Sequence, residues 1–298
     1  MSSRAWQIER TWLSGRTVLI TGTTSGIGLA AARQLAPWAG RLLLVGRNGD
    51  LLRSVGAQLR RDFPQVIVDE FQADLLLQAD TRRVAEWVLQ QPALHALINN
   101  VGAVFDDCQL TADGIERQFA VNYVNQAMLT RLVLPKLIQS GDAATPSRIV
   151  MVSSIAHRRA KPLTTEFTGL KPYVGLLTYR QSKLAQTLFT VELARRLEDS
   201  PITVSAVCPG FTRTDIGTKH ANLVSRAVWW LASRFFHSVE VGAAHVVRMA
   251  ADDSLAGQTG FYYESGSPHA FGDLIADEAA AQSLWNETCD RLGLPHDL

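Results

Sequence analysis

A tyrosine and a lysine stand four residues apart at Tyr179 and Lys183, beside a segment of helical periodicity. Positions i and i+4 share one helix face, so the phenol and the ammonium would lie side by side. A free phenol, with a pKa of about 10, is a poor proton exchanger at neutral pH, and a nearby cation lowers that pKa. The pair therefore predicts an acid–base centre, with an exposed helix face and an extended lysine as the alternative. Tyr173 competes for the role, but the residue four positions after it is Leu177, which carries no charge.

Two adjacent serines end a short apolar run and could supply a hydroxyl to the same site. Successive strand residues face opposite sides of a sheet, so only one of Ser153 and Ser154 can face a substrate. A hydroxyl there can hydrogen-bond a substrate oxygen. His157 follows closely and raises the possibility of a hydrolase, but no Gly-x-Ser-x-Gly elbow surrounds either serine.

A glycine-rich turn follows the first apolar run, with Gly22, Gly26 and Gly28 between Thr17–Thr21 and the helical pattern of Ile27–Leu35. Glycines allow a tight turn and let a pyrophosphate approach the helix N-terminus, whose free N–H groups and dipole favour anions. The spacing is Gly-x-x-x-Gly-x-Gly, which departs from the common dinucleotide pattern. We expect a dinucleotide site here, and an ordinary turn is the alternative.

The end of the second apolar run should select the nucleotide. A carboxylate at this point would bind a ribose 2′-hydroxyl and repel a 2′-phosphate. Here Gly46 leaves space and Arg47 offers a planar cation suited to phosphate. The residues favour NADP(H) over NAD(H), and a solvated surface arginine is the competing interpretation.

The elements that must position these residues alternate along the chain. Seven short apolar runs predict strands at Thr17–Thr21, Arg41–Val45, Val66–Phe71, Ala96–Asn99, Arg148–Ser153, Thr203–Val207 and Gly260–Tyr263. Helical periodicity covers Ile27–Leu35, Leu51–Arg61, Thr81–Leu89, Ile115–Leu137, Leu184–Leu197 and Val239–Ala250. This alternation predicts an α/β fold, a single doubly wound domain over 1–298 with helices on both faces of a mostly parallel sheet. Segments 155–178 and 212–237 interrupt the pattern, and the first is a long irregular insertion of a kind that is often functional.

Composition narrows the function classes. The 298 residues are 47% hydrophobic and carry a net charge of +1, which argues against a nucleic-acid partner. The three cysteines and the histidines lack metal-ligand spacing, so no metal is expected. No apolar stretch approaches the ~18 residues of a membrane span, and the N-terminus lacks a signal-peptide pattern. We expect a cytoplasmic protein.

Several motifs occur together in one order: the glycine turn, Asn99-Asn100-Val101-Gly102, the strand-end serine and Tyr-x-x-x-Lys. In this order they resemble the short-chain dehydrogenase/reductase family, from about Leu13 to Tyr263. The resemblance implies one Rossmann-type domain, usually with a seven-stranded parallel sheet. The segments Val152–His157 and Leu110–Glu116 are similar to the retinol-dehydrogenase-like branch.

The resemblance also implies roles for residues. Catalysis would rest on Asn122, Ser154, Tyr179 and Lys183, with Asn122 holding a water in a proton relay through Lys183. Asp74 would bond the adenine amino group, and Val101 replaces the family's usual alanine. The cofactor-binding set would comprise Gly22, Thr24, Ser25, Gly26, Ile27, Gly28, Arg47, Asp74, Leu75, Asn100, Val101, Gly102, Tyr179, Lys183, Pro209, Gly210, Thr212 and Thr214.

The expected activity is hydride transfer between NADP(H) and a carbonyl or alcohol carbon, with a non-catalytic NADP(H)-binding sensor or scaffold as the alternative. Trp229 and Trp230 lie where the family has its substrate lid, so a bulky apolar substrate is expected. Core packing, an oligomer interface and a membrane-touching helix remain alternatives for this aromatic segment. A homo-oligomer is compatible with the sequence.

Overall fold

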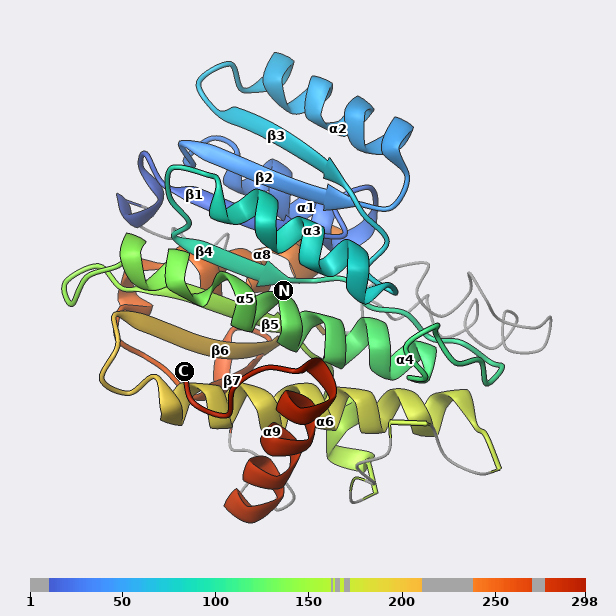
Figure 1. Cartoon of the computed structure of the whole chain (residues 1–298). Helices are drawn as coiled ribbons and strands as arrows, with labels where there is room; N and C mark the ends of the chain where they lie inside the picture. The colour runs from blue at the N-terminus through green and yellow to red at the C-terminus, as the bar shows by residue number, and fades with distance from the viewer. Residues whose placement is uncertain (1–10, 162, 164–166, 169–171, 211–237, 270–276) are drawn as a thin grey trace.

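The computed structural model describes residues 11–161, 163, 167–168, 172–210, 238–269 and 277–298. Within these residues one eight-stranded sheet has the order β3-β2-β1-β4-β5-β6-β7-β8 (Figure 1). The strands are β1 (Thr17–Thr21), β2 (Arg41–Gly46), β3 (Ile67–Gln72), β4 (Ala96–Asn99), β5 (Ser147–Val152), β6 (Ile202–Cys208), β7 (Phe261–Glu264) and β8 (Ser267–His269). The helices are α1 (Gly26–Leu35), α2 (Gly49–Asp62), α3 (Gln78–Leu89), α4 (Arg117–Phe119), α5 (Asn125–Ser140), α6 (Gly175–Arg196), α8 (Val239–Ala251) and α9 (Glu278–Leu292). Short 3-10 turns occupy η1 (Thr11–Leu13), η3 (Ile155–Arg159) and η6 (Asp253–Leu255), and η2 (Ala120–Val124) is π-helical.

Strands β1 to β7 are all parallel, which confirms the predicted doubly wound sheet. The chain order reverses between β1 and β4, which are hydrogen-bonded neighbours. Ligands of open α/β sheets bind at such a reversal, outside the carboxyl ends of the strands. The strand count differs from seven because β8 adds an antiparallel edge, where Tyr263 pairs with Pro268.

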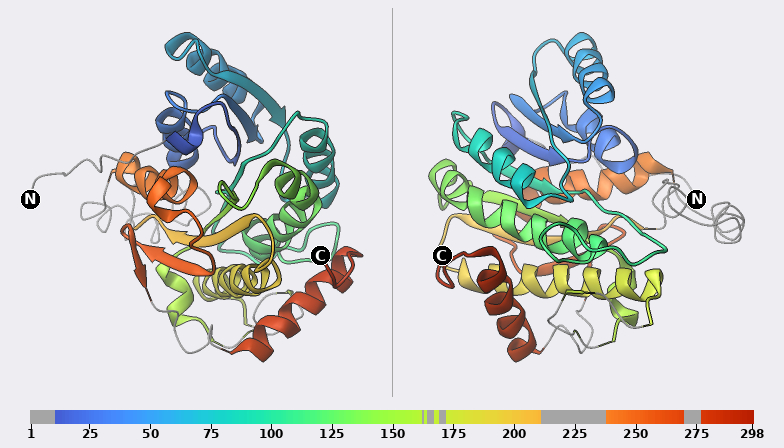
Figure 2. Two further views of the ribbon diagram at one scale, coloured as in Figure 1. Left: turned by 90° about the vertical axis from the view of Figure 1, so that its left-hand side faces the viewer. Right: turned by 45° about the vertical axis from the view of Figure 1, so that its right-hand side comes forward.

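Alternate residues of the central strand enter two different cores, as the period of a strand requires. Val18 and Ile20 pack with α1, α2 and α8, whereas Leu19 packs with α3, α5 and α6 on the opposite face. Figure 2 shows α1 beside α8 on one face and α6 with α9 on the other. Both faces of the sheet are therefore covered, which explains the continuous apolar runs of the strands.

Two helices differ strongly from their predicted extents, and α9 has no predicted counterpart. The predicted helix Ile115–Leu137 is divided into α4, the π-helical η2 and α5. Helix α6 begins at Gly175, nine residues before the predicted Leu184, because its first turns bury polar side chains that hide the apolar period. The segment 155–178 thus opens with η3 and closes inside α6. No helix among the described residues is long and apolar enough to cross a membrane.

Candidate active site

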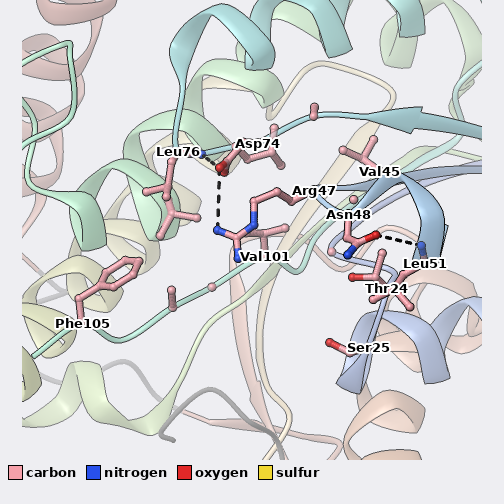
Figure 3. A pocket seen from close by; sticks show the side chains of 17 residues that line it. Thr24, Ser25, Val45, Arg47, Asn48, Leu51, Asp74, Leu76, Val101 and Phe105 are labelled. Atoms are coloured by element: carbon pink, nitrogen blue, oxygen red, sulfur yellow. Dashed lines mark hydrogen bonds and ion pairs between the residues drawn. The ribbon is translucent and has the colours of Figure 1, made fainter. Parts of the chain in front are cut away.

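A cavity of about 600 Å³ opens at the carboxyl ends of β1, β2, β3 and β4 (Figure 3). Its walls come from loops that follow these strands. The lining residues are Gly22, Thr24, Ser25, Val45, Gly46, Arg47, Asn48, Leu51, Ala73, Asp74, Leu75, Leu76, Val101, Gly102, Ala103, Phe105 and Val121. The cavity therefore lies at the reversal of strand order, where the glycine turn predicts a dinucleotide.

The glycine turn has the conformation that a pyrophosphate site needs. Gly22 and Gly26 have φ of 74° and 57°, a region that L side chains rarely adopt. A Cβ on Gly28 would lie 2.2 Å from the Gly22 carbonyl oxygen, so only glycine allows α1 to approach the turn this closely. Ser25 is the N-cap of α1, and its side chain makes no capping hydrogen bond. The first N–H groups of the helix thus remain available to an anion, and the turn fits a dinucleotide phosphate.

Asn100 fastens the turn rather than lining the cavity. Its side chain donates to the Thr21 carbonyl oxygen at 2.8 Å, and its backbone N–H donates to the Thr21 hydroxyl at 2.9 Å. This contact ties the end of β4 to the end of β1. The neighbouring Val101 and Gly102 do line the cavity, so the Asn-Asn-Val-Gly run both supports and forms its wall.

Arg47 and Asp74 face each other across the cavity (Figure 3). The guanidinium nitrogen lies 3.8 Å from the Asp74 carboxylate, and the Arg47 side chain is 59% exposed. The other Asp74 oxygen accepts the Leu76 N–H at 3.1 Å, while the Asp74 N–H donates to Asp80 at 2.8 Å. A loose, exposed ion pair of this kind is worth at most about 1 kcal/mol, so Arg47 can leave Asp74 for a stronger anion.

The two serines have different environments. Ser153 is buried, and its hydroxyl lies 2.9 Å from the Thr187 hydroxyl. Ser154 is partly exposed: its Oγ accepts the Ala156 N–H at 3.2 Å, and its hydroxyl lowers the pKa of Tyr179. The structure thus brings Ser154 and Tyr179 together, although neither they nor Lys183 line the cavity described above.

Burial dominates the electrostatics of the tyrosine and lysine. It raises the pKa of Tyr179 to about 12, and the Ser154 hydrogen bond offsets part of that increase. Burial also lowers the pKa of Lys183 to about 7. The Lys183 Nζ lies 5.9 Å from the Tyr179 ring centroid and donates to the Val152 carbonyl oxygen at 2.9 Å. Desolvation is thus the largest influence on the pKa of Tyr179, and the lowering expected from the i, i+4 pair stays a prediction.

Asn122 lies in the π-helical turn η2, and its side chain is fully used. Its Oδ1 accepts the Ala103 N–H at 2.8 Å, and its Nδ2 donates to the Ala103 carbonyl at 2.9 Å and to Ser182 at 3.0 Å. The Ser182 hydroxyl in turn donates to the Tyr179 carbonyl oxygen at 2.8 Å. Asn122 thus connects the cavity wall at Ala103 to the helix that carries Tyr179.

The competing tyrosine belongs to a different cluster. The Tyr173 hydroxyl lies 3.0 Å from the buried Glu116 carboxylate and accepts a hydrogen bond from Gln118 at 2.7 Å. Burial and the Glu116 charge raise the pKa of Tyr173. The Tyr173 hydroxyl thus has Glu116 and Gln118 as partners, and the choice of Tyr179 over Tyr173 stays a prediction.

The remaining predicted residues fall into three groups: those that line the cavity or begin α1, those that follow β6, and those outside the described residues. Leu75, Thr24 and Ser25 line the cavity, and Ile27 lies in the first turn of α1. Pro209 and Gly210 follow β6, and Gly210 has a φ of 82°. Thr212, Thr214, Trp229 and Trp230 lie outside the described residues. No group of three His, Cys, Asp or Glu side chains in the described part of the chain could hold a metal ion.

Sequence reasoning missed most of the apolar cavity wall, including Leu51, Leu76, Phe105 and Val121. A signal for some of them was available, because Leu76 and Phe105 follow the ends of predicted strands. Position relative to a strand end, rather than chemical type, would have identified them.

Comparisons with known proteins agree on a family. The family model described as short chain dehydrogenase matches residues 16–223. Human retinol dehydrogenase 11 is 35% identical over 96% of this chain and 88% of its own length. Mouse retinol dehydrogenase 12 is 34% identical over 95% and 88%. A short-chain dehydrogenase from Sphingobium yanoikuyae, solved in complex with NADPH, superposes with a TM-score of 0.67 at 26% identity, covering 91% of this chain and 95% of that one.

Proposed function

Because the chain belongs to the short-chain dehydrogenase family and is similar to its retinol dehydrogenases, we propose that it reduces the carbonyl group of a bulky apolar substrate with NADPH. The family assignment makes the protein an oxidoreductase acting on CH–OH and C=O groups. The cofactor preference, the direction and the substrate class are the proposal.

The observation that carries the proposal is the Tyr179 phenol, whose pKa burial raises and Ser154 lowers, in a chain whose glycine turn fits a dinucleotide phosphate. With a pKa of about 12, Tyr179 is a neutral phenol at pH 7 and can donate its proton to a carbonyl oxygen. The Ser154 hydroxyl offers a second hydrogen bond to the same oxygen. Two preorganised donors stabilise the charge that develops on that oxygen.

Lys183 would exchange protons with the site, and Asn122 would position the helix that carries Tyr179. Lys183, with a pKa of about 7, exchanges protons readily near neutral pH and lies on the same face of α6 as Tyr179. Asn122 holds α6 against the Ala103 loop through Ser182. When bound, the nicotinamide of the cofactor supplies or accepts the hydride. The chain itself positions the carbonyl and moves the proton.

Arg47 supports the choice of NADP(H). The residues at the end of β2 are Gly46, Arg47 and Asn48, so no carboxylate there opposes a 2′-phosphate. The guanidinium lines the cavity, and among the described residues its ion pair is the 3.8 Å contact with Asp74. The related dehydrogenase from Sphingobium yanoikuyae was solved with NADPH, in agreement with this assignment.

The bulky apolar substrate rests on the relatives and on the cavity wall. The similar proteins are named for retinol, an apolar alcohol. Phe105 and Val121 line the cavity together with Ala103. The Ala103 N–H donates to Asn122, so this part of the wall is connected to the predicted catalytic residues. We propose that the segment holding Trp229 and Trp230 covers the substrate.

The experiment uses Tyr179→Phe with Tyr263→Phe as its matched control. Tyr263 is a buried tyrosine on β7, and its hydroxyl bonds Gln258, away from the site. NADPH binding is measured by fluorescence titration, and turnover is measured on a panel of bulky ketones and aldehydes. We expect Tyr179→Phe to abolish turnover with NADPH affinity retained, and the control to keep both. Undiminished turnover in Tyr179→Phe refutes the proposal, and NADPH binding without any turnover favours a sensor or scaffold.

A further inference from the structure

A chain of buried side-chain amides extends from Lys183 to the cavity wall. The Lys183 Nζ donates to Gln186 Oε1 at 3.2 Å, and Gln186 Nε2 donates to Gln126 Oε1 at 2.6 Å. Gln126 Nε2 then donates to the Val101 and Val121 carbonyl oxygens at 2.5 and 3.0 Å. Both glutamine side chains are buried, one on α6 and the other on α5.

The hydrogen-bonding capacity of each group fixes the direction of this chain. An ammonium can only donate, so Gln186 must present its oxygen to Lys183 and its nitrogen to Gln126. Backbone carbonyls can only accept, so Gln126 must present its nitrogen to Val101 and Val121. Both amides therefore have one consistent orientation. Reversing either amide would set donor against donor or oxygen against oxygen.

The series of hydrogen-bonded amides ends at the wall of the cavity. Val101 and Val121 both line that cavity. The Val101 side chain lies against the glycine turn, because a Cβ on Gly22 would come within 2.9 Å of its Cγ2. Val121 belongs to the π-helical turn η2, so the Gln126 side chain also ties this turn to α5.

We propose that Gln186 and Gln126 form an amide relay that positions the Lys183 ammonium and couples it to the wall of the cofactor cavity. The proposal rests on the function proposed for Lys183 above. Neither glutamine contacts a reacting atom in this arrangement, so both are positioning residues.

Charge around Lys183 makes the relay testable. Among the described residues, the groups facing its Nζ are the Tyr179 ring on α6, the Cys208 thiol at the end of β6, and the Val152 and Gln186 oxygens. The Cys208 thiol offsets part of the lowering that burial imposes on the lysine pKa. The two oxygens accept hydrogen bonds from the Nζ, and a hydrogen bond to the charged form favours it.

The experiment measures the pKa of Lys183 in the full chain without cofactor or substrate. Urea unfolding is followed from pH 6 to 10 for each protein with and without Lys183→Met, and the difference isolates the titration of Lys183. We expect Gln186→Met to lower that pKa by about one unit, because a hydrogen bond to the ammonium is lost. Gln186→Glu should raise it by about one to three units, because a carboxylate then faces the ammonium. Gln126→Met should shift it in the same direction as Gln186→Met but by less.

The control is Gln118→Met, which removes another buried glutamine whose amide bonds Tyr173 and the Gly175 carbonyl. Gln118→Met should leave the Lys183 pKa unchanged, whatever its effect on stability. Where turnover is measurable, the pH profile of kcat should move down for Gln186→Met and up for Gln186→Glu. An unchanged Lys183 pKa in both Gln186 variants overturns the relay. Absence of turnover in the unmodified protein instead refutes the proposed function, and the unfolding measurement still tests the relay.

Discussion

Replacing Lys183 by methionine should stabilise the folded chain below pH 7 while removing its acid–base chemistry. Burial lowers the pKa of this lysine from 10.5 to about 7, and the side chain is only 3% exposed. Each pKa unit corresponds to about 1.4 kcal/mol, so holding the charge inside the protein costs about 5 kcal/mol. Methionine leaves the Val152 and Gln186 oxygens without this donor, which costs about 1–3 kcal/mol. The net gain at pH 6 should therefore be about 2–4 kcal/mol.

The sign of the pH dependence follows from proton binding. Between the folded pKa of about 7 and the unfolded value of 10.5, the unfolded chain binds more protons at this lysine than the folded chain. The destabilisation that the buried charge of Lys183 causes is absent above pH 10.5 and grows progressively as the pH falls to about 7. Across this window the free energy of unfolding should rise with pH by up to about 1.4 kcal/mol per unit, relative to Lys183→Met.

Urea unfolding at pH 6, 8 and 10 measures this difference. Lys161→Met is the matched control, because Lys161 is an exposed lysine and its replacement should leave the pH dependence unchanged. Lys183→Met should be more stable than the parent protein at pH 6, and this advantage should disappear or reverse by pH 10, where only the cost of the lost hydrogen bonds remains. Parallel curves for the two proteins across this range would show that the lysine is not held in a desolvated site, and the reasoning would fail.

Four further substitutions test other parts of the site. Gly28→Ala places a methyl group 2.2 Å from the Gly22 carbonyl oxygen, so NADPH affinity and the melting temperature should both fall, as measured by fluorescence titration and thermal unfolding. Arg47→Gln should weaken NADPH binding about 10- to 100-fold and leave NADH binding nearly unchanged, and an equal loss for both would contradict the 2′-phosphate assignment. Ser154→Ala should lower kcat about 100-fold or more, as measured by steady-state kinetics. Ser153→Ala should chiefly lower the free energy of unfolding, by about 1 kcal/mol, as measured by urea unfolding. A loss of kcat in Ser153→Ala but not in Ser154→Ala would show that Ser153 is the serine that faces the substrate.

The sheet could be predicted because its strands are buried on both faces. In β1 all five residues are buried, and the observed bounds Thr17–Thr21 are those expected from the sequence. Helix α6 could not be bounded in this way. Gln181, Ser182 and Lys183 are polar yet buried, and polar residues at buried positions obscure the apolar period of the helix.

The site was predictable in part for a similar reason. A strand-end serine and a Tyr-x-x-x-Lys pair predict one site, and Ser154 is among the groups that lower the pKa of Tyr179. Their catalytic roles stay predictions. Gln126 carried no comparable signal, because a glutamine on another helix is indistinguishable in sequence from a surface residue. Long-range packing alone brings it to Gln186.

The hairpin formed by β7 and β8 has a consequence for contacts between molecules. An uncovered strand at the margin of a sheet exposes unpaired N–H and C=O groups to which a neighbouring chain can add. Here β8 occupies that margin with three residues, and Pro268 in the middle has no N–H to donate. We therefore expect fibril-like growth of the sheet through this side to be blocked by proline.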